Sequence, residues 1–182
     1  MSSQISTGSI DENWCRAEQW PDAQRPENWA WLTHRGSLTQ KLRELAGDAF
    51  HVRVLNETLT ELGEDDARLL AAKPGSRARL REVHLCGASP LVYGRTLAAA
   101  EDAVTLLAGL GAQPLGDRVF GAPVTERGDI EIKCVDRGDE LYRAATQTLV
   151  NPPSALWARR SVLHVQGTRL LIYECFLPGV SG

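Results

Sequence analysis

The chain has 182 residues, of which 43% are hydrophobic and 24% are charged, and its formal net charge is −3 at pH 7. This length and composition predict one globular domain with a hydrophobic core, and they exclude a disordered, collagen-like or coiled-coil chain. The negative balance argues against nucleic-acid binding through bulk electrostatics, although it leaves room for a local basic pocket. We therefore expect a single folded domain and no nucleic-acid partner.

No stretch of the sequence reaches the roughly 18 to 20 consecutive apolar residues that a membrane-spanning helix needs. Residues 1–13 are rich in Ser, Thr and Gly, and they lack the basic start and apolar centre of a secretory signal. We therefore expect a cytoplasmic protein without an integral membrane segment. Residues 1–13 are expected to form a flexible N-terminus, and residues 14–182 the single domain.

Neither the cysteines nor the usual nucleotide motifs indicate a bound metal or organic cofactor. The cysteines occupy four widely scattered positions, Cys15, Cys86, Cys134 and Cys175. This spacing fits neither a zinc site nor a disulfide framework. The glycine fingerprint of dinucleotide-binding folds, the Walker glycine loop and the G-x-S-x-G elbow are all missing from the sequence.

The first predicted element is an irregular segment, followed by a helix. Residues 14–32 contain four of the five tryptophans among two prolines, which predicts a strap packed onto the body of the domain. Ser37–Ala46 is a predicted helix because Ser37 and Gln40 have capping-box spacing and leucines recur at helical intervals. Gly47 supplies the expected end of this helix.

A strand, a short helix and a hairpin are predicted next. Apolar residues alternate over residues 50–54, as in a strand, and acids open a short helix over residues 64–72. Residues 77–86 and 91–97 are strand-like and flank residues 87–90, whose Gly-Ala-Ser-Pro sequence is a turn signal.

The second half of the chain is predicted to end in another hairpin. Helices are expected over residues 98–110, at residues 115–120 and around residues 140–148, with a strand over residues 130–134 between the last two. Two further strands, residues 157–165 and 169–177, flank the turn Gln166-Gly167-Thr168. The strands are predicted in consecutive hairpins and the helices in separate parts of the chain, and this arrangement predicts an α+β fold in which helices cover an antiparallel sheet.

Two charged residues share predicted strand faces with apolar residues. Period-two geometry places Arg81 on the face of Val83, and Glu174 on the face of Ile172. A buried charge without compensation is strongly destabilising, so each of these residues needs a partner. Three readings remain open: a structural ion pair between Arg81 and Glu174, an apolar face that is in fact exposed, and a site for an ionic ligand.

Several short blocks of residues follow one another in order from about residue 30 to residue 178. They are Ser76-Arg77, Leu80-Arg81-Glu82, Leu85-Cys86, Gly94-Arg95-Thr96, Pro114-Leu115-Gly116, Phe120, Ile130-Glu131-Ile132, Leu156-Trp157, Arg159-Arg160-Ser161, Glu174 and Phe176-Leu177-Pro178. As an ordered set, these blocks resemble the chorismate pyruvate-lyase family.

The resemblance implies a chorismate lyase-like fold, in which an antiparallel sheet of about six strands has helices on one side and a buried site beneath helical flaps. It also implies a carbon–oxygen lyase that eliminates pyruvate from chorismate and gives 4-hydroxybenzoate, the first committed step of ubiquinone biosynthesis. No metal or organic cofactor is expected from it, and a monomer is the default.

The resemblance also assigns site residues. The family's arginine at the position of Arg81 binds the ring carboxylate of the substrate, helped by backbone amides at the positions of Leu38 and Leu115. The glutamate at the position of Glu174 meets the 4-hydroxyl group, and Arg95 matches an arginine near the mouth of the site. Whether Glu174 accepts the C4 proton or only holds the hydroxyl is left open by the sequence.

Physical chemistry agrees with these assignments. Chorismate is a dianion, and the planar fork of an arginine holds a carboxylate through two parallel charge-assisted hydrogen bonds. The elimination requires an oriented substrate, the exclusion of water and an acceptor near C4. Arg81 and Glu174 are therefore the candidate catalytic residues.

The alternative function is a non-catalytic domain of the same fold that binds a small ligand. The effector-sensing modules of some bacterial transcription regulators are similar in this way. Such regulators carry a winged-helix DNA-binding domain, and the roughly 30 residues before Trp31 are too few to hold one.

Overall fold

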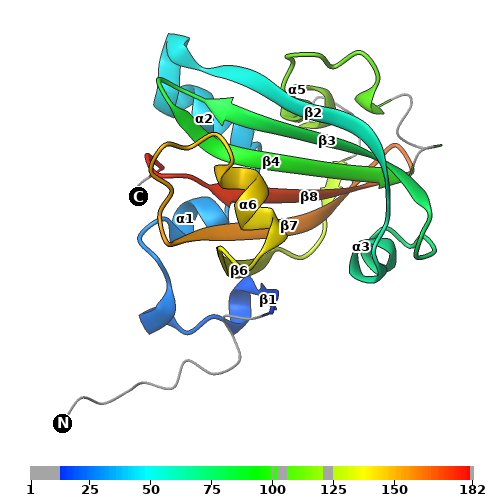
Figure 1. The fold of residues 1–182 in the computed structure, drawn as a ribbon, viewed down its shortest axis with the longest axis horizontal. Helices are drawn as coiled ribbons and strands as arrows, with labels where there is room; N and C mark the ends of the chain where they lie inside the picture. Colours follow the sequence, from blue (N-terminus) through cyan, green and yellow to red (C-terminus); the bar gives the residue numbers. More distant parts are fainter. Residues whose placement is uncertain (1–12, 100, 102–105, 121–124, 181–182) are drawn as a thin grey trace.

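An eight-stranded antiparallel sheet runs through the computed structural model, which describes residues 13–99, 101, 106–120 and 125–180 (Figure 1). Its strands are β1 (Cys15–Arg16), β2 (His51–Glu61), β3 (Arg77–Cys86), β4 (Pro90–Ala99), β5 (Thr125–Arg127), β6 (Glu131–Asp136), β7 (Ala155–Val165) and β8 (Thr168–Phe176). Their order is β1-β6-β7-β8-β4-β3-β2, and β5 pairs with β7. The six longer strands match the expected number, and the short β1 and β5 extend the sheet.

Both predicted hairpins are confirmed. β3 and β4 are joined across residues 87–89, and β7 and β8 are joined at Gln166 and Gly167. These two turn residues have φ angles of 50° and 81°, the left-handed conformation that tight hairpin turns require. The hairpins pair with each other through β4 and β8, so the last strand of the chain lies in the middle of the sheet.

Helices cover both faces of the sheet. The α-helices are α1 (Trp29–Leu32), α2 (Leu38–Ala46), α3 (Glu64–Leu69), α5 (Leu115–Phe120) and α6 (Glu140–Thr146), and short 3-10 helices are Ala17–Gln19, Asp22–Gln24 and Gly47–Ala49. α6 lies across the strands on one face, where its Leu141 packs into a core cluster with Tyr93 of β4 (Figure 1). The expectation that helices cover one side is therefore wrong. None of the described helices is long and apolar enough to span a bilayer.

The opposite face carries α1 and α2, and the capping prediction for α2 is confirmed. The Ser37 hydroxyl accepts a hydrogen bond from the Gln40 backbone N–H at 3.2 Å, and Gly47 ends the helix at a φ of 54°. Leu38 and Leu42 of α2 pack with Val92 of β4 in the core of this face. The helix therefore has its first turn against the centre of the sheet.

The predicted helix over residues 98–110 begins too early. Ala98 and Ala99 belong to β4, where they pair with Arg79 and Ala78 of β3. Alanine favours helices, but this weak preference is overridden by the hydrogen bonds of the extended hairpin. Glu101, Leu106 and Leu107 are helical, and the rest of the segment between them lies outside the described residues.

The predicted tryptophan strap is confirmed. Residues 14–32 contain β1, two 3-10 helices and α1, and they run along the β6 edge of the sheet. Trp20 is buried against Trp157 of β7, with ring centroids 5.1 Å apart in an edge-to-face arrangement. Trp31 and Leu32 of α1 are also buried in the same core. The strap therefore completes the core on the α2 face.

Candidate active site

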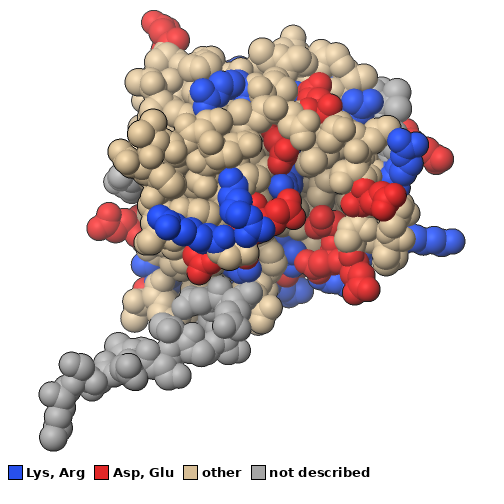
Figure 2. Space-filling model, viewed as in Figure 1, with Lys and Arg blue, Asp and Glu red and all other residues tan. Residues whose placement is uncertain are grey.

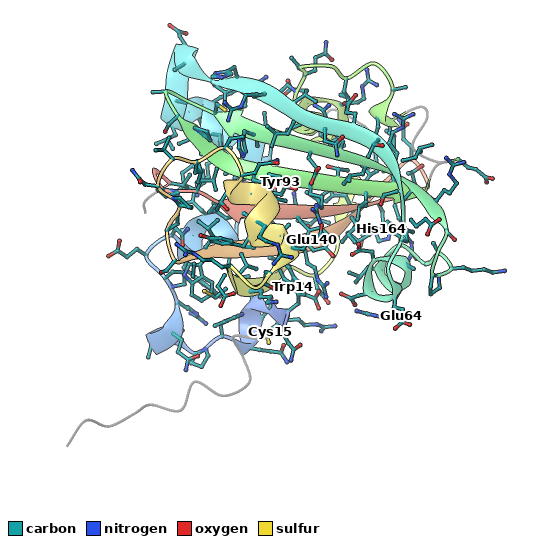
Figure 3. The ribbon with its side chains drawn as sticks, in the orientation of Figure 1. Trp14, Cys15, Glu64, Tyr93, Glu140 and His164 are labelled. Carbon is teal, nitrogen blue, oxygen red and sulfur yellow. The ribbon has the colours of Figure 1, made fainter. Side chains whose placement is uncertain are left out.

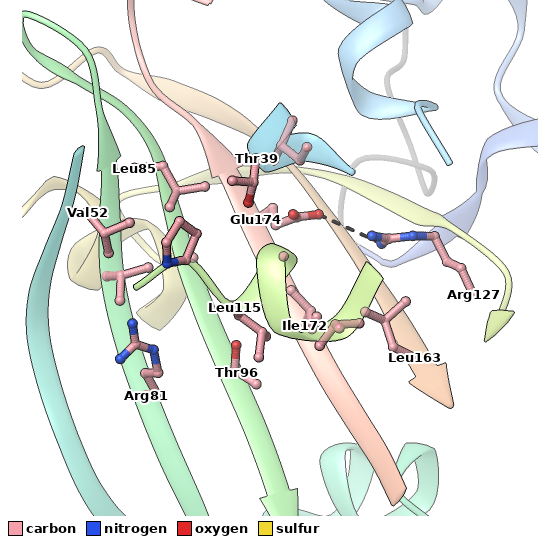
Figure 4. Close-up of a pocket in the computed structure, with 16 residues that line it drawn as sticks. Thr39, Val52, Arg81, Leu85, Thr96, Leu115, Arg127, Leu163, Ile172 and Glu174 are labelled. Carbon is pink, nitrogen blue, oxygen red and sulfur yellow. Dashed lines mark ion pairs between the residues drawn. The ribbon is translucent and has the colours of Figure 1, made fainter. Parts of the chain in front are cut away.

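A largely apolar cavity of about 600 Å³, its open mouth included, lies on the sheet face that α2 and α5 cover (Figure 4). Among the described residues that line it, the charged ones are Arg81, Arg127 and Glu174. Leu38 and Leu115, the first residues of α2 and α5, also line the cavity. Four of the five residues predicted for the site are thus brought together.

Arg81 is held at one side of the cavity by a fixed set of acceptors. Its side chain is 3% exposed, and it projects from β3 opposite Glu57 of β2, with which it forms an ion pair. The guanidinium also donates to the backbone oxygens of Gly111, at 3.0 and 3.1 Å, and of Gln113, at 3.1 Å. Because Arg81 binds Glu57, the suggested structural ion pair between Arg81 and Glu174 is wrong.

Glu174 instead pairs with Arg159, its direct neighbour across β7 and β8. Arg159 donates from Nε to Glu174 Oε2 at 2.5 Å, and Arg127 Nη1 lies 4.0 Å from the same oxygen. Burial raises the pKa of the Glu174 carboxyl, but the charges of Arg159 and Arg127 outweigh it and lower the pKa below its usual value. Glu174 is therefore ionised at neutral pH.

Arg159 is completely buried and ties Glu174 to the strap. Its Nη1 donates to the backbone oxygens of Trp31 at 3.1 Å, Leu32 at 3.2 Å and His34 at 2.6 Å. These carbonyls lie at the end of α1 and just beyond it, where a helix attracts a positive charge. Arg159 thus donates hydrogen bonds to the backbone carbonyls at this helix end and fixes the orientation of Glu174.

The first turns of α2 and α5 meet at the cavity because Gly116 has no side chain. A Cβ atom at Gly116 would clash with the Thr39 hydroxyl and lie 2.9 Å from its Cβ. An ion pair at 2.7 Å between Arg43 of α2 and Asp117 of α5 also joins the two helices. The first backbone N–H groups of a helix lack intrahelical acceptors, so two sets of such donors begin at Leu38 and Leu115.

The structure does not place Arg95 with the other predicted site residues. Its neighbours Gly94 and Thr96 line the cavity, so Arg95 points to the opposite face of β4. Tyr93 of β4 and Glu140 of α6 lie on that face (Figure 3). There it donates to Glu82 at 3.1 Å and to Glu140 at 2.8 Å. Arg95 is therefore part of an ion-pair network outside the cavity.

Cys86 and Cys175 are free thiols that lie buried in strands. Burial raises the pKa of the thiols of Cys86 and Cys175, so both are neutral at physiological pH. Across the described ranges, no three His, Cys, Asp or Glu side chains come together as a set of metal ligands. The charged groups that the described cavity wall offers to a ligand are its arginines and its carboxylate.

Sequence reasoning missed Arg127 and the role of Arg159. Alternation along β7 indicates that Arg159 and Arg160 face opposite sides, but it does not say which side holds Glu174. That choice follows from the pairing of β7 with β8, which places Arg159 opposite Glu174. Arg127 lies in a strand of only three residues, too short for a pattern to show its direction.

The sequence comparisons identify related proteins over nearly the whole chain. A profile of the family described as Chorismate lyase matches residues 11–181. The "Probable chorismate pyruvate-lyase" of Azoarcus sp. (strain BH72) is 38% identical over 160 residues, which cover 84% of each chain. That of Pseudomonas aeruginosa (strain UCBPP-PA14) is 36% identical over 171 residues, which cover 92% of each chain.

Solved structures with the same fold include bacterial transcription regulators. PhnF from Mycobacterium smegmatis matches with a TM-score of 0.59 at 12% identity, over 82% of this chain and 67% of its own. The ligand-binding domain of a putative GntR-family regulator from Bordetella bronchiseptica matches with a TM-score of 0.54 at 16% identity, over 71% and 83%. At these identities the likeness is one of fold alone.

Proposed function

Because the chain belongs to the chorismate lyase family, it is a lyase that eliminates pyruvate from chorismate to give 4-hydroxybenzoate, and we propose that this reaction takes place in the cavity under α2 and α5. In the family this is the first committed step of ubiquinone biosynthesis. The observation that carries the proposal is the presence of a buried arginine, Arg81, and an ionised glutamate, Glu174, in one largely apolar cavity.

Arg81 binds the ring carboxylate of chorismate in this proposal. Its guanidinium is buried and already held in one plane by Glu57 and two backbone carbonyls, so little freedom is lost when a ligand binds. A carboxylate is a stronger acceptor than a neutral carbonyl, so the ligand competes with the oxygens of Gly111 and Gln113. Binding therefore shifts the loop that precedes α5.

The backbone amides that begin at Leu38 and Leu115 assist Arg81. The two helix starts lie against each other over the cavity, so their free N–H groups can donate to a carboxylate without any further charged side chain. The apolar side chains around them exclude water, which strengthens each of these polar contacts. Recognition of the ring carboxylate thus combines one guanidinium with two helix starts.

Glu174 accepts a hydrogen bond from the 4-hydroxyl group of chorismate and also accepts the proton from ring carbon C4. The C3–O bond breaks, its electron pair leaves on the enolpyruvate oxygen, and loss of the C4 proton makes the ring aromatic. Enolpyruvate then takes up one proton at its methylene carbon and becomes pyruvate, so the two products together contain all the atoms of chorismate. Aromatisation provides the driving force, which allows a carboxylate with a low pKa to act as the base.

The remaining parts of the proposal concern the whole chain. We propose that residues 14–182 form the catalytic domain, that the protein acts as a monomer, and that it works in the cytoplasm. The expected flexible N-terminus, residues 1–13, lies outside the described residues except for residue 13. The free thiols of Cys86 and Cys175 fit a reducing compartment. Basic and acidic side chains are intermixed on the face in Figure 2, which supports the absence of a nucleic-acid partner.

A non-catalytic ligand-binding module is not favoured as the function. The two regulators compared above are 12% and 16% identical to this chain, whereas the two lyases compared there are 38% and 36% identical over most of both chains. A module of that kind would bind chorismate and 4-hydroxybenzoate without releasing pyruvate. Incubation of the purified chain with chorismate, followed by a pyruvate assay, separates the two functions.

The experiment that tests the site compares Arg81→Gln and Arg81→Lys with a control, Arg77→Gln, at an exposed arginine that begins the same strand. We expect Arg81→Gln to weaken 4-hydroxybenzoate binding by at least about 100-fold, because it removes a buried, charge-assisted contact. Arg81→Lys should recover part of the affinity, since lysine offers a point charge without the fork. Unchanged affinity in folded Arg81→Gln, measured by calorimetry, would contradict the proposal.

A further inference from the structure

Arg127 is a second buried arginine of the cavity, and it lies across the cavity from Arg81 (Figure 4). It ends β5, and its side chain is 5% exposed. Its Nη1 donates to the Ser161 hydroxyl at 2.6 Å and lies 4.0 Å from Glu174 Oε2. The proposed binding of the ring carboxylate and the 4-hydroxyl group does not use this guanidinium.

Among the side chains that the structure describes, positive charge exceeds negative charge around Arg127. Those that act on it electrostatically are one carboxylate, Glu174, and two further guanidiniums, Arg159 and Arg35. Arg159 already binds Glu174 at 2.5 Å, so two buried guanidiniums share one carboxylate. Burial is the main reason that the pKa of Arg127 falls, to about 10, and Arg159 and Arg35 add to it. Arg127 is still protonated at neutral pH, and a second anion beside it would balance the cluster.

The substrate can supply that anion. Chorismate carries one carboxylate on its ring and another on its enolpyruvyl side chain. The enolpyruvyl oxygen and the 4-hydroxyl group stand on adjacent ring carbons, C3 and C4. If Glu174 holds the 4-hydroxyl, the enolpyruvyl group lies beside Glu174, and Arg127 is the described cationic side chain of the cavity wall on that side.

We propose that Arg127 binds the enolpyruvyl carboxylate of the substrate and stabilises the negative charge that develops on the ether oxygen as the C3–O bond breaks. A carboxylate oxygen and the ether oxygen are three bonds apart, a separation that the two parallel N–H groups of a guanidinium can bridge. This inference rests on the proposed binding of the ring carboxylate by Arg81. It makes Arg127 the residue that distinguishes the dianionic substrate from the product, which retains only the ring carboxylate.

The test uses two unreactive aromatic ligands of the same shape. The first, 3-(1-carboxyvinyloxy)benzoate, has both carboxylates, and the second, 3-(isopropenyloxy)benzoate, lacks the one on the side chain. We expect the unmodified protein to bind the dianion at least tenfold more tightly. In Arg127→Gln this preference should fall below twofold, while the affinities for the monoanion and for 4-hydroxybenzoate stay within about threefold. Arg127→Lys should keep part of the preference, and the exposed Arg137→Gln all of it.

Turnover gives a second readout, and kcat/KM for chorismate should fall by about 10² to 10³ in Arg127→Gln, the usual loss when a donor to developing charge is removed. Equal binding of the two ligands by the unmodified protein overturns the inference, whether or not the variant folds. Equal weakening of both ligands in Arg127→Gln also overturns it, because Arg127 would then act only through Glu174. Arg81→Gln should weaken the binding of both ligands. If it does not, the proposed binding of the ring carboxylate by Arg81 is wrong.

Discussion

Glu174 combines two properties that rarely occur together: it is buried, and its carboxylate is held ionised by arginines on both sides. Arg159 and Arg127 both approach the same oxygen, Oε2. This arrangement keeps the charge of the glutamate in the apolar cavity, where an isolated carboxylate would take up a proton. A carboxylate that is both desolvated and charged is suited to accepting a proton from a bound substrate.

Replacing Glu174 by Gln separates its chemical role from its structural one. If the carboxylate accepts the C4 proton, kcat should fall by about 10²-fold or more, while 4-hydroxybenzoate still binds. Steady-state kinetics and calorimetry measure the two effects, and Glu126→Gln, at an exposed position of β5, is the control. Lower thermal stability with unchanged turnover per folded molecule would show that Glu174 only balances its arginines.

The lowered pKa of Glu174 predicts how activity responds to acid. Arg159, Arg127 and His34 face the carboxyl group, and their positive charges hold it ionised below its usual range near 4.3. The stabilisation from this ion cluster is therefore present above that pH and is lost as the pH falls through the lower, folded-state pKa. We expect kcat/KM to show no acid limb from Glu174 above about pH 4.5.

The same measurement on Arg127→Gln tests the cause of the low pKa. Removing one of the positive charges should raise the pKa of Glu174 and move the acid limb of kcat/KM to higher pH. Rate measurements between pH 4 and pH 8 would reveal the shift. An acid limb that does not move would mean that Arg159 alone sets the ionisation of Glu174.

At the scale of elements, the contact between α2 and α5 determines how the cavity is covered. The two helices approach closely at Gly116, and Arg43 and Asp117 bridge them through two hydrogen bonds of 2.7 Å. Both side chains of this pair are about half exposed, so the ion pair adds little stability and the steric fit at Gly116 matters more. The cavity is thus covered by two short helices that pack closely against each other.

Gly116→Ala should disrupt the close contact between α2 and α5. The added methyl group overlaps Thr39, so we expect a loss of about 1–3 kcal/mol in unfolding free energy and faster dissociation of 4-hydroxybenzoate. Denaturant titration and stopped-flow displacement measure these effects. Gly63→Ala is the control, because a Cβ atom there meets nothing within 4 Å, and it should cost less than about 1 kcal/mol. Equal effects of the two variants would show that the helices do not depend on close contact.

At the scale of the whole molecule, the strap of residues 14–32 belongs to the core. Trp20 is 1% exposed and packs edge-to-face on Trp157 of β7. We expect Trp20→Ala to cost about 3–5 kcal/mol of unfolding free energy, as removal of a buried aromatic side chain usually does. Leu45→Ala, at a half-exposed leucine, is the control for thermal unfolding. A small effect of Trp20→Ala would mean that the strap merely lies on the surface.

Local signals in the sequence were enough to predict most of the elements. The turn residues at Gln166 and Gly167 predict a hairpin, and the cap at Ser37 predicts α2, because both depend on neighbours within a few residues. The end of β4 was mispredicted because its alanines favour a helix on their own and are extended only through pairing with β3.

The site could be predicted only in part, for a related physical reason. Burial of Arg81 and Glu174 follows from strand alternation, since each shares a face with apolar residues. Their actual partners, Glu57 and Arg159, are fixed by which strands are adjacent, and no local pattern contains that information. The resemblance to a family supplied Leu38 and Leu115, and it also suggested Arg95, which lies on the other face of the sheet.

The central position of β8 has a consequence for how the protein is made. β8 pairs with β4 on one side and with β7 on the other, so it joins strands that have no other shared neighbour in the described sheet. During synthesis, β2–β4 and β5–β7 emerge from the ribosome first, as two half-sheets with open edges that invite pairing with other chains. β8 closes both edges at once and brings Glu174 to Arg159, so the proposed catalytic centre is assembled only after all the other strands of the sheet have emerged.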